Sequence, residues 1–98
     1  MNMMSDFVIR EPGFYCQRDE KNFFDWLAAI PGIKGVRGVP AGLSIYINAT
    51  QMDRAAWSDM IALFARYKVN IKCMSQIKMG ANEEWLREAH HYWHEMIF

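Results

Sequence analysis

The sequence predicts one α+β domain of two layers, in which a small antiparallel sheet is covered by helices. Three observations carry this prediction. Residues 50–67 have the apolar periodicity of an amphipathic helix. Residues 43–48 alternate between apolar and polar side chains, as a strand with one buried face does. Residues 19–30 and 82–98 repeat the helical pattern on either side of these two segments, so strands and helices can pack as two layers.

The helix expected over residues 50–67 has both a start signal and a wide apolar face. Thr50 is expected to cap its first turn, and Asp53 can reach back to it as in a capping box. Arg66 and Lys68 lie near the C-terminal end, where cations favour the helix dipole. The apolar positions, Trp57 and Phe64 among them, cover so much of the circumference that this helix needs packing partners on two sides. We therefore expect it to form the centre of the core.

Length and composition fit a single domain over residues 1–98, with a loose tail at residues 1–5. Apolar residues make up 52% of the chain and aromatic residues 14%, which excludes disorder. There is no run of 18 apolar residues that would span a membrane. The N-terminal residues lack the basic start and apolar stretch of a signal peptide, so a cytoplasmic location is expected.

The N-terminal third predicts one or two strands followed by a helix. Residues 7–9 and 14–16 are rich in β-formers and are separated by Glu-Pro-Gly at 11–13, which indicates either a bent strand or two short ones. Asp19 is expected to cap the helix that follows. Pro31 and Gly32 should end that helix, because proline cannot continue it and glycine tolerates the turn.

A hairpin is expected next. Residues 33–39 and 43–48 read as strands, and Pro-Ala-Gly at 40–42 supplies the turn between them. Gly35 and Gly38 weaken the first strand. Their presence indicates a bulge, or a place where another backbone comes close.

Residues 69–77 are ambiguous, and two topologies stay open. As a strand, this segment would complete a split βαβ or ferredoxin-like sheet, which is the simpler arrangement and the one we favour. As a helical turn, it would leave a small sheet covered by three helices. In both cases a last helix is expected from Asn82, with Glu83 and Glu84 in its first turn.

No motif predicts catalysis or a cofactor. His90 and His94 have the i, i+4 spacing of a metal-binding pair, but no second ligand pair accompanies them, so we expect surface histidines and no metal. Cys16 and Cys73 are far apart in sequence and are expected to be reduced and buried, the alternatives being a disulfide or a nucleophile. The glycines match no dinucleotide fingerprint. We therefore expect no enzyme.

The charges sum to zero but are segregated along the chain. Acids exceed bases in residues 1–33 and 79–98, and bases exceed acids in residues 34–78. A neutral total argues against a general nucleic-acid binder. The basic middle nevertheless supports an alternative, a small nucleic-acid-binding or regulatory module, in which Tyr46 would stack on bases. Its candidate cations are Lys34, Arg37, Lys68, Lys72 and Lys78.

Three stretches, residues 23–38, 61–74 and 82–98, together resemble a family of small bacterial proteins, the immunity proteins of contact-dependent growth inhibition and related polymorphic toxin systems. The similarity rests largely on aromatic and apolar positions. They are Phe24, Trp26, Leu27, Ile30, Pro31, Leu63, Phe64, Arg66, Tyr67, Asn82, Trp85, Tyr92, Trp93, Ile97 and Phe98.

The resemblance implies a cytoplasmic, non-catalytic protein that binds a bacterial toxin domain and blocks it. Many such toxins are nucleases with basic active sites, which acidic helix faces would complement. The expected partner-binding residues are therefore acids of the first and last helices. They are Asp19, Glu20, Asp25, Glu83, Glu84, Glu88 and Glu95.

Overall fold

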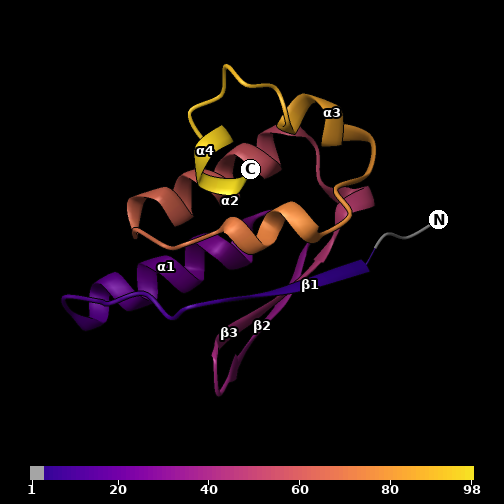
Figure 1. Ribbon diagram of the computed structural model, residues 1–98. Coiled ribbons are helices and arrows are strands. Elements are labelled where there is room, and N and C mark those ends of the chain that lie inside the picture. The colour runs from indigo at the N-terminus through magenta and orange to yellow at the C-terminus, as the bar shows by residue number, and fades with distance from the viewer. Residues whose placement is uncertain (1–3) are drawn as a thin grey trace.

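The computed structural model describes residues 4–98 (Figure 1). The strands are β1 (Met4–Ile9), β2 (Ile33–Val39) and β3 (Gly42–Asn48). The two long helices are α1 (Gln17–Ala29) and α2 (Arg54–Arg66). The short elements are the 3-10 turns η1 (Ala49–Gln51), η2 (Lys72–Gln76) and η3 (Gly80–Asn82) and the helices α3 (Glu83–Leu86) and α4 (His94–Ile97).

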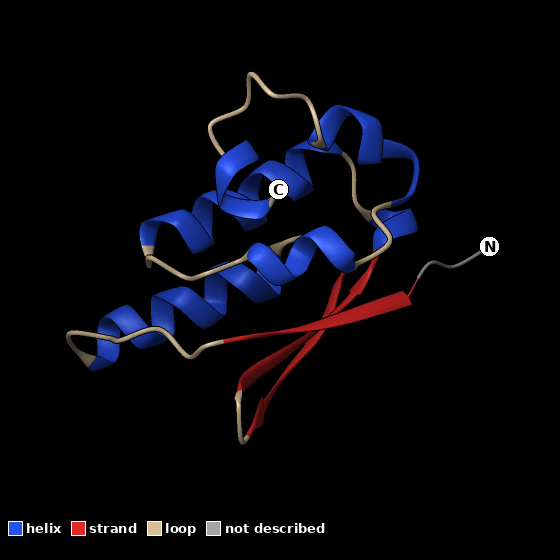
Figure 2. Ribbon diagram, in the orientation of Figure 1, coloured by secondary structure: helices blue, strands red, loops and turns tan. Residues whose placement is uncertain are grey.

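The three strands form one antiparallel sheet in the order β1-β3-β2. Because β3 is antiparallel to both neighbours, β1 and β2 are parallel to each other and are joined by α1, which is a split βαβ arrangement. The predicted α+β class is therefore confirmed. Helices gather on one side of the sheet (Figure 2), and on the other side Met4, Val8 and Tyr46 remain 50%, 41% and 45% exposed.

The fourth strand of a ferredoxin-like sheet does not form, so the topology that we favoured for residues 69–77 is wrong. Residues 72–76 form η2, which packs beside β1 where that strand would have paired. The side chain of Asn70 accepts a hydrogen bond from the Lys72 amide at 3.0 Å, which starts a helical turn. The turn buries Ile71 and Met74 on one side, and an extended strand would separate them.

The first helix begins earlier than expected. Cys16 is its N-cap, and its side chain makes no capping bond. Asp19 lies in the first turn and accepts a hydrogen bond from the Tyr15 amide at 3.3 Å, so it supports the turn without capping it. Residues 14–16 form no strand, and Phe14 instead packs edge-on against Phe23 with 5.6 Å between ring centroids.

The end of α1 and the hairpin follow the sequence prediction. Gly32 adopts φ +95°, and a Cβ there would lie 2.2 Å from Cγ of Met52, so only glycine fits. Pro40 and Ala41 form the turn between β2 and β3. The register shifts between Ile33 and Gly35, which confirms the bulge.

Helix α2 is the buried centre of the core, as predicted, but it begins four residues later than Thr50. Asp53 is the N-cap, and its Oδ1 accepts a hydrogen bond from the Ala56 amide at 2.8 Å. Residues 49–51 form η1 instead, where Asn48 Oδ1 accepts from the Thr50 amide at 3.1 Å. Trp57 and Phe64 are fully buried.

The last helix expected from Asn82 is interrupted. Residues 87–93 are irregular and separate α3 from α4. Asn82 does not cap α3, because its side-chain amide donates to the carbonyl oxygen of Met52 at 3.0 Å.

The loose N-terminal tail expected at residues 1–5 also differs. Met4 and Ser5 belong to β1, and residues 1–3 lie outside the described part of the chain. Within residues 4–98, no helix has the length and apolar character to cross a membrane.

Candidate functional site

The C-terminal segment, residues 83–98, combines exposed charged side chains with buried apolar ones. Its buried side chains are Leu86, Trp93 and Ile97. The loop at residues 87–93 projects from the helical layer (Figure 1). Because the side chains between the buried ones point outward, this segment has a packed underside and a polar outer side.

Aromatic rings hold this segment in one conformation. The His91 ring stacks on Trp93 with 4.1 Å between centroids and 14° between planes. Trp85 meets Trp93 edge-on at 5.4 Å. The indole N–H of Trp93 donates to the carbonyl oxygen of Leu86 at 2.9 Å, and His91 Nε2 lies 3.0 Å from the carbonyl oxygen of Trp85. These contacts replace the hydrogen bonds that a continuous helix would make, which explains the break after α3.

Three cations join the segment to the rest of the domain. The Arg54 guanidinium of α2 lies 5.0 Å from the centre of the Trp85 ring. Arg87 lies 4.5 Å from the Phe98 ring centre and donates to the carbonyl oxygen of Ser75 at 3.4 Å. Lys72 of η2 donates to the carbonyl oxygen of Glu95. The loop is therefore fixed at both ends.

The four carboxylates of this segment differ in how far they are neutralised. Glu83 pairs with Arg87 at 3.6 Å, and Glu88 lies 3.7 Å from the His90 ring nitrogen. Glu84 and Glu95 are exposed and make no ion pair within residues 4–98. The uncompensated negative charge of the segment therefore comes chiefly from these two residues.

Tyr92 extends this surface toward the long helices. Its ring is 59% exposed. Partial burial raises the pKa of its hydroxyl, and the nearby Arg66 guanidinium opposes that shift. Arg66 in turn lies 5.8 Å from the centre of the Trp26 ring on α1. Aromatic and arginine side chains of this kind are enriched at protein interfaces.

The acids predicted on α1 lie apart from those of the C-terminal segment. Figure 1 places the N-terminal end of α1 and helix α3 at opposite ends of the domain. Asp19 is engaged with the Tyr15 amide, and Asp25 pairs with Lys21. Glu20 is exposed. The structure therefore does not bring the seven predicted acids together into one surface.

His90 and His94 do not lie on one face of a helix, as their i, i+4 spacing suggested. His90 and His94 would share a helical face only if residues 87–93 were helical. His90 instead packs against His91, with 4.2 Å between ring centroids, and His94 packs against Phe98 at 5.9 Å. Across residues 4–98, no group of three or more histidine, cysteine or carboxylate side chains could hold a metal ion.

Both cysteines are free thiols, so the disulfide alternative is wrong. Cys16 is exposed, contrary to the expected burial, whereas Cys73 is partly buried and its thiol donates to the carbonyl oxygen of Val8 at 3.4 Å. Burial raises the pKa of the Cys73 thiol, an effect that a backbone hydrogen bond partly offsets. A raised pKa lowers the fraction of reactive thiolate.

The basic residues of the middle third do not form one face. Lys34 and Arg37 lie on β2, at one edge of the sheet, and Lys72 lies on η2, beside the opposite edge. Tyr46 is exposed on the open face of the sheet. The register pairs it with Gly35, next to Arg37. A nucleic-acid surface would therefore have two cations and one ring, which is small for that purpose.

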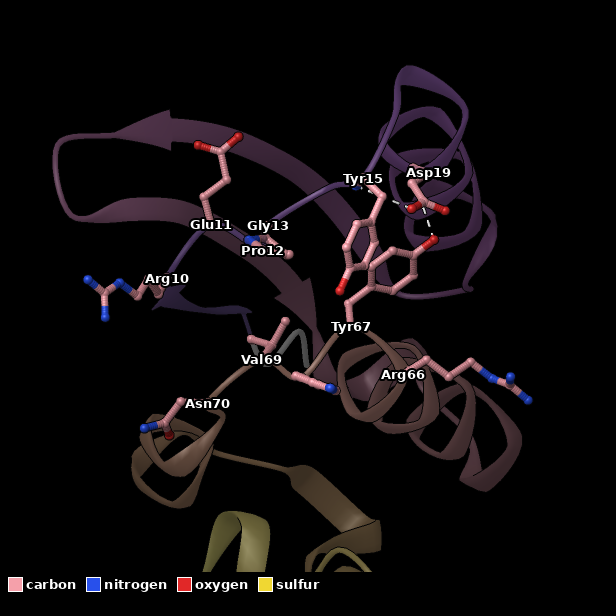
Figure 3. A pocket seen from close by; sticks show the side chains of 11 residues that line it. Arg10, Glu11, Pro12, Gly13, Tyr15, Asp19, Arg66, Tyr67, Val69 and Asn70 are labelled. Carbon is pink, nitrogen blue, oxygen red and sulfur yellow. Dashed lines mark hydrogen bonds between the residues drawn. The ribbon is translucent and has the colours of Figure 1, made fainter.

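A pocket of about 670 Å³ opens between two connections, the one that leads into α1 and the one that leaves α2 (Figure 3). Tyr15 and Tyr67 lie close together in it, and Arg10 and Arg66 point to opposite sides. Lys68 also lines it and adopts φ 56°, a left-handed conformation that favours glycine. Sequence reasoning missed this pocket, because its lining residues are about 50 positions apart and carry no motif.

Comparisons of the chain with sequence families, with curated proteins and with solved structures found no match.

Proposed function

We propose that this protein is a non-catalytic, immunity-type protein of the bacterial cytoplasm, which binds a toxin domain and blocks it. The observation that supports this proposal most directly is the C-terminal segment. Its carboxylates are exposed, and stacked rings and hydrogen bonds hold its backbone in place. A binding surface that is already ordered loses little conformational entropy when its partner docks.

The charge of this surface suits a basic partner. Glu84 and Glu95 are not neutralised within the described chain, and Glu88 faces only a histidine. A nuclease binds the phosphates of its substrate with cationic side chains, and carboxylates on a fixed loop can occupy the same positions. Opposite charges also accelerate association. A nuclease toxin is therefore the target class that we propose.

Tyr92 is the proposed centre of the contact. It lies on the same loop as Glu88, is largely exposed, and has a hydroxyl that can donate to a partner. Tyrosine residues often contribute a large part of the binding energy of an interface, and surrounding charges set its orientation. The buried Trp93 beside it keeps the loop in place and has no free polar group.

Co-expression with a nuclease toxin domain from a neighbouring gene tests the proposal. The wild-type chain should protect cells and bind the toxin domain. The double variant Glu84→Lys with Glu95→Lys should lose protection, and its association rate should fall and lose its dependence on salt. The matched control is Glu20→Lys with Asp25→Lys, which changes the net charge equally but on helix α1.

The results distinguish an error in the proposed interface from an error in the proposed function. If only the α1 variant loses protection, the toxin binds at α1 and the C-terminal segment is not the interface. If the wild-type chain neither protects cells nor binds the toxin domain, the proposed function is wrong.

A further inference from the structure

Within residues 4–98, no other element pairs with the outer edge of β2, so the sheet can accept another strand there. The order β1-β3-β2 leaves two edges. Part of the edge of β1 is occupied by η2, whose Cys73 thiol donates to the carbonyl oxygen of Val8. Unpaired edges attract other strands unless they are protected.

The hydrogen bonds between β2 and β3 show which backbone groups face outward. The Asn48 amide donates to the carbonyl oxygen of Gly32 at 2.8 Å, so Ile33 and Ile47 form a non-hydrogen-bonded pair. Such pairs alternate with hydrogen-bonded pairs along β3. The hydrogen-bonded positions of β3 are therefore Tyr46, Ser44 and Gly42, so the backbone groups of their partners Gly35, Arg37 and Val39 bond to β3. The N–H and C=O groups of Val36 and Gly38 therefore point to the free edge.

The fold itself does not require glycine at positions 35 and 38. Neither residue has a positive φ, and a Cβ at either position would meet no atom within 4 Å. Glycine weakens the interior of a strand, so these two residues lower the stability of β2 without a compensating contact in the domain. A bare backbone at a sheet edge does, however, permit close approach of a second backbone.

A groove between β2 and α1 runs beside this edge. It has a volume of about 380 Å³ and an apolar lining that includes Phe24, Ala28 and Val36. Lys34 lies at its rim, and Arg37 follows on the same strand. Neither cation makes an ion pair within the described chain. The edge therefore offers outward backbone groups, an apolar groove and two unpaired positive charges.

We propose that the outer edge of β2 binds an extended acidic segment of a partner protein, which adds to the sheet as a fourth strand. The segment exchanges hydrogen bonds with Val36 and Gly38, one of its apolar side chains enters the groove, and its carboxylates face Lys34 and Arg37. The inference does not rest on the proposed toxin binding, because that proposal uses the acids of the C-terminal segment.

A second copy of this chain fits the outer edge of β2 less well than an acidic partner does. Two antiparallel β2 strands that bond through Val36 and Gly38 would be related by an axis at Arg37. The two arginines would then lie directly opposite each other on one face, where like charges destabilise the pair. Charge complementarity therefore selects an acidic strand.

A library of random dodecapeptides displayed on phage, selected against the full chain, tests this proposal. The enriched peptides should be acidic with alternating apolar residues. Gly38→Pro removes an outward N–H and should weaken binding of a synthetic enriched peptide by about tenfold, the effect of one lost hydrogen bond. The matched variant Gly38→Ala keeps the N–H and adds only a Cβ to the bare backbone, so it should weaken binding less than Gly38→Pro does.

A second measurement does not depend on whether Gly38→Pro folds. In the wild-type protein, the peptide should slow hydrogen exchange at the Val36 and Gly38 amides, and not at those of Arg37 and Val39, which already bond to β3. The proposal is overturned if no peptide is enriched, if the enriched peptides are not acidic, or if they protect other amides. Self-association that Gly38→Pro abolishes would overturn it in favour of a second copy.

Discussion

The hydroxyl of Tyr67, at the end of α2, donates a hydrogen bond of 3.2 Å to the carbonyl oxygen of Asp19 in the first turn of α1 (Figure 3). The same hydroxyl lies 3.3 Å from the side-chain nitrogen of Asn22, which donates to it. The Tyr67 ring also packs edge-on against Phe23 at 5.1 Å. One side chain therefore fixes the position of α2 relative to α1.

Replacing Tyr67 by phenylalanine should keep the ring contacts and remove both hydrogen bonds of the hydroxyl. We expect the free energy of unfolding to fall by about 0.5–1.5 kcal/mol for each bond lost, as for a typical intramolecular hydrogen bond. Urea denaturation followed by circular dichroism measures this change. Tyr46→Phe is the control, because Tyr46 is exposed on the open sheet face and its hydroxyl has no bond within residues 4–98. Equal effects of the two variants would contradict the role given to Tyr67.

Trp57 is fully buried in α2, and its indole N–H has no hydrogen-bond partner among residues 4–98. Trp57→Ala should lower the free energy of unfolding by about 3–5 kcal/mol, because it leaves a large cavity. Trp57→Phe should cost clearly less, since it fills part of the cavity and removes the unsatisfied donor. Thermal unfolding of the three proteins measures the order. If Trp57→Ala abolished partner binding in a chain that is still folded, the active surface would lie at α2 instead of the C-terminal segment.

Lys68 is the one residue other than glycine with a positive φ in the described chain. It follows the C-terminal end of α2, where glycine is the usual residue. Lys68→Gly should therefore raise the melting temperature, corresponding to about 1 kcal/mol of relieved backbone strain. Lys68→Ala retains the strain and should give no such gain. If both variants behave alike, the side chain and not the backbone determines stability at this position.

The two cysteines should react at different rates. Cys16 is exposed, whereas burial raises the pKa of the Cys73 thiol. At neutral pH, iodoacetamide should therefore alkylate Cys16 faster, by roughly tenfold if access and thiolate fraction act together. Peptide mass spectrometry of timed samples gives both rates. Because the pKa of Cys73 is raised in the folded state, its contribution to stability is complete below the ordinary thiol pKa and is lost as the pH rises through the raised value.

Local signals in the sequence predicted most of the elements. The apolar stripe of α2 and the end of α1 before Pro31-Gly32 each depend on neighbours a few residues away, and both are present. The strand β3 also forms, but its predicted single buried side is wrong in part, because Ser44 and Asn48 are buried as well. The helix starts were less exact. Thr50 and Asp19 are good capping residues, but Asp53 and Cys16 occupy the N-cap positions, because the turns before them are fixed by contacts of Asn48 and Tyr15.

The other differences between the predictions from the sequence and the structure arise from contacts between residues that are distant in the chain. The break between α3 and α4 follows from Trp93, whose ring must reach both Trp85 and the carbonyl oxygen of Leu86. The helical turn at 72–76 depends on burial against β1. The same limit applies to the site. All seven acids can be read from the sequence, but only the fold shows that the N-terminal end of α1 and helix α3 lie at opposite ends of the domain.

The position of β1 has a consequence for the order in which this chain can fold. Its Phe7 pairs with Ile45 of β3, and on its other side it contacts η2, whose Cys73 is 65 residues from Val8. β1 therefore has no neighbour on either side until β3 and η2 have been made. Pairing over such separations is slow, because a long loop has to close first. A nascent chain that has reached only the hairpin turn exposes Phe7 and Ile9 on a strand with both edges bare, and such a strand can pair with other chains and aggregate.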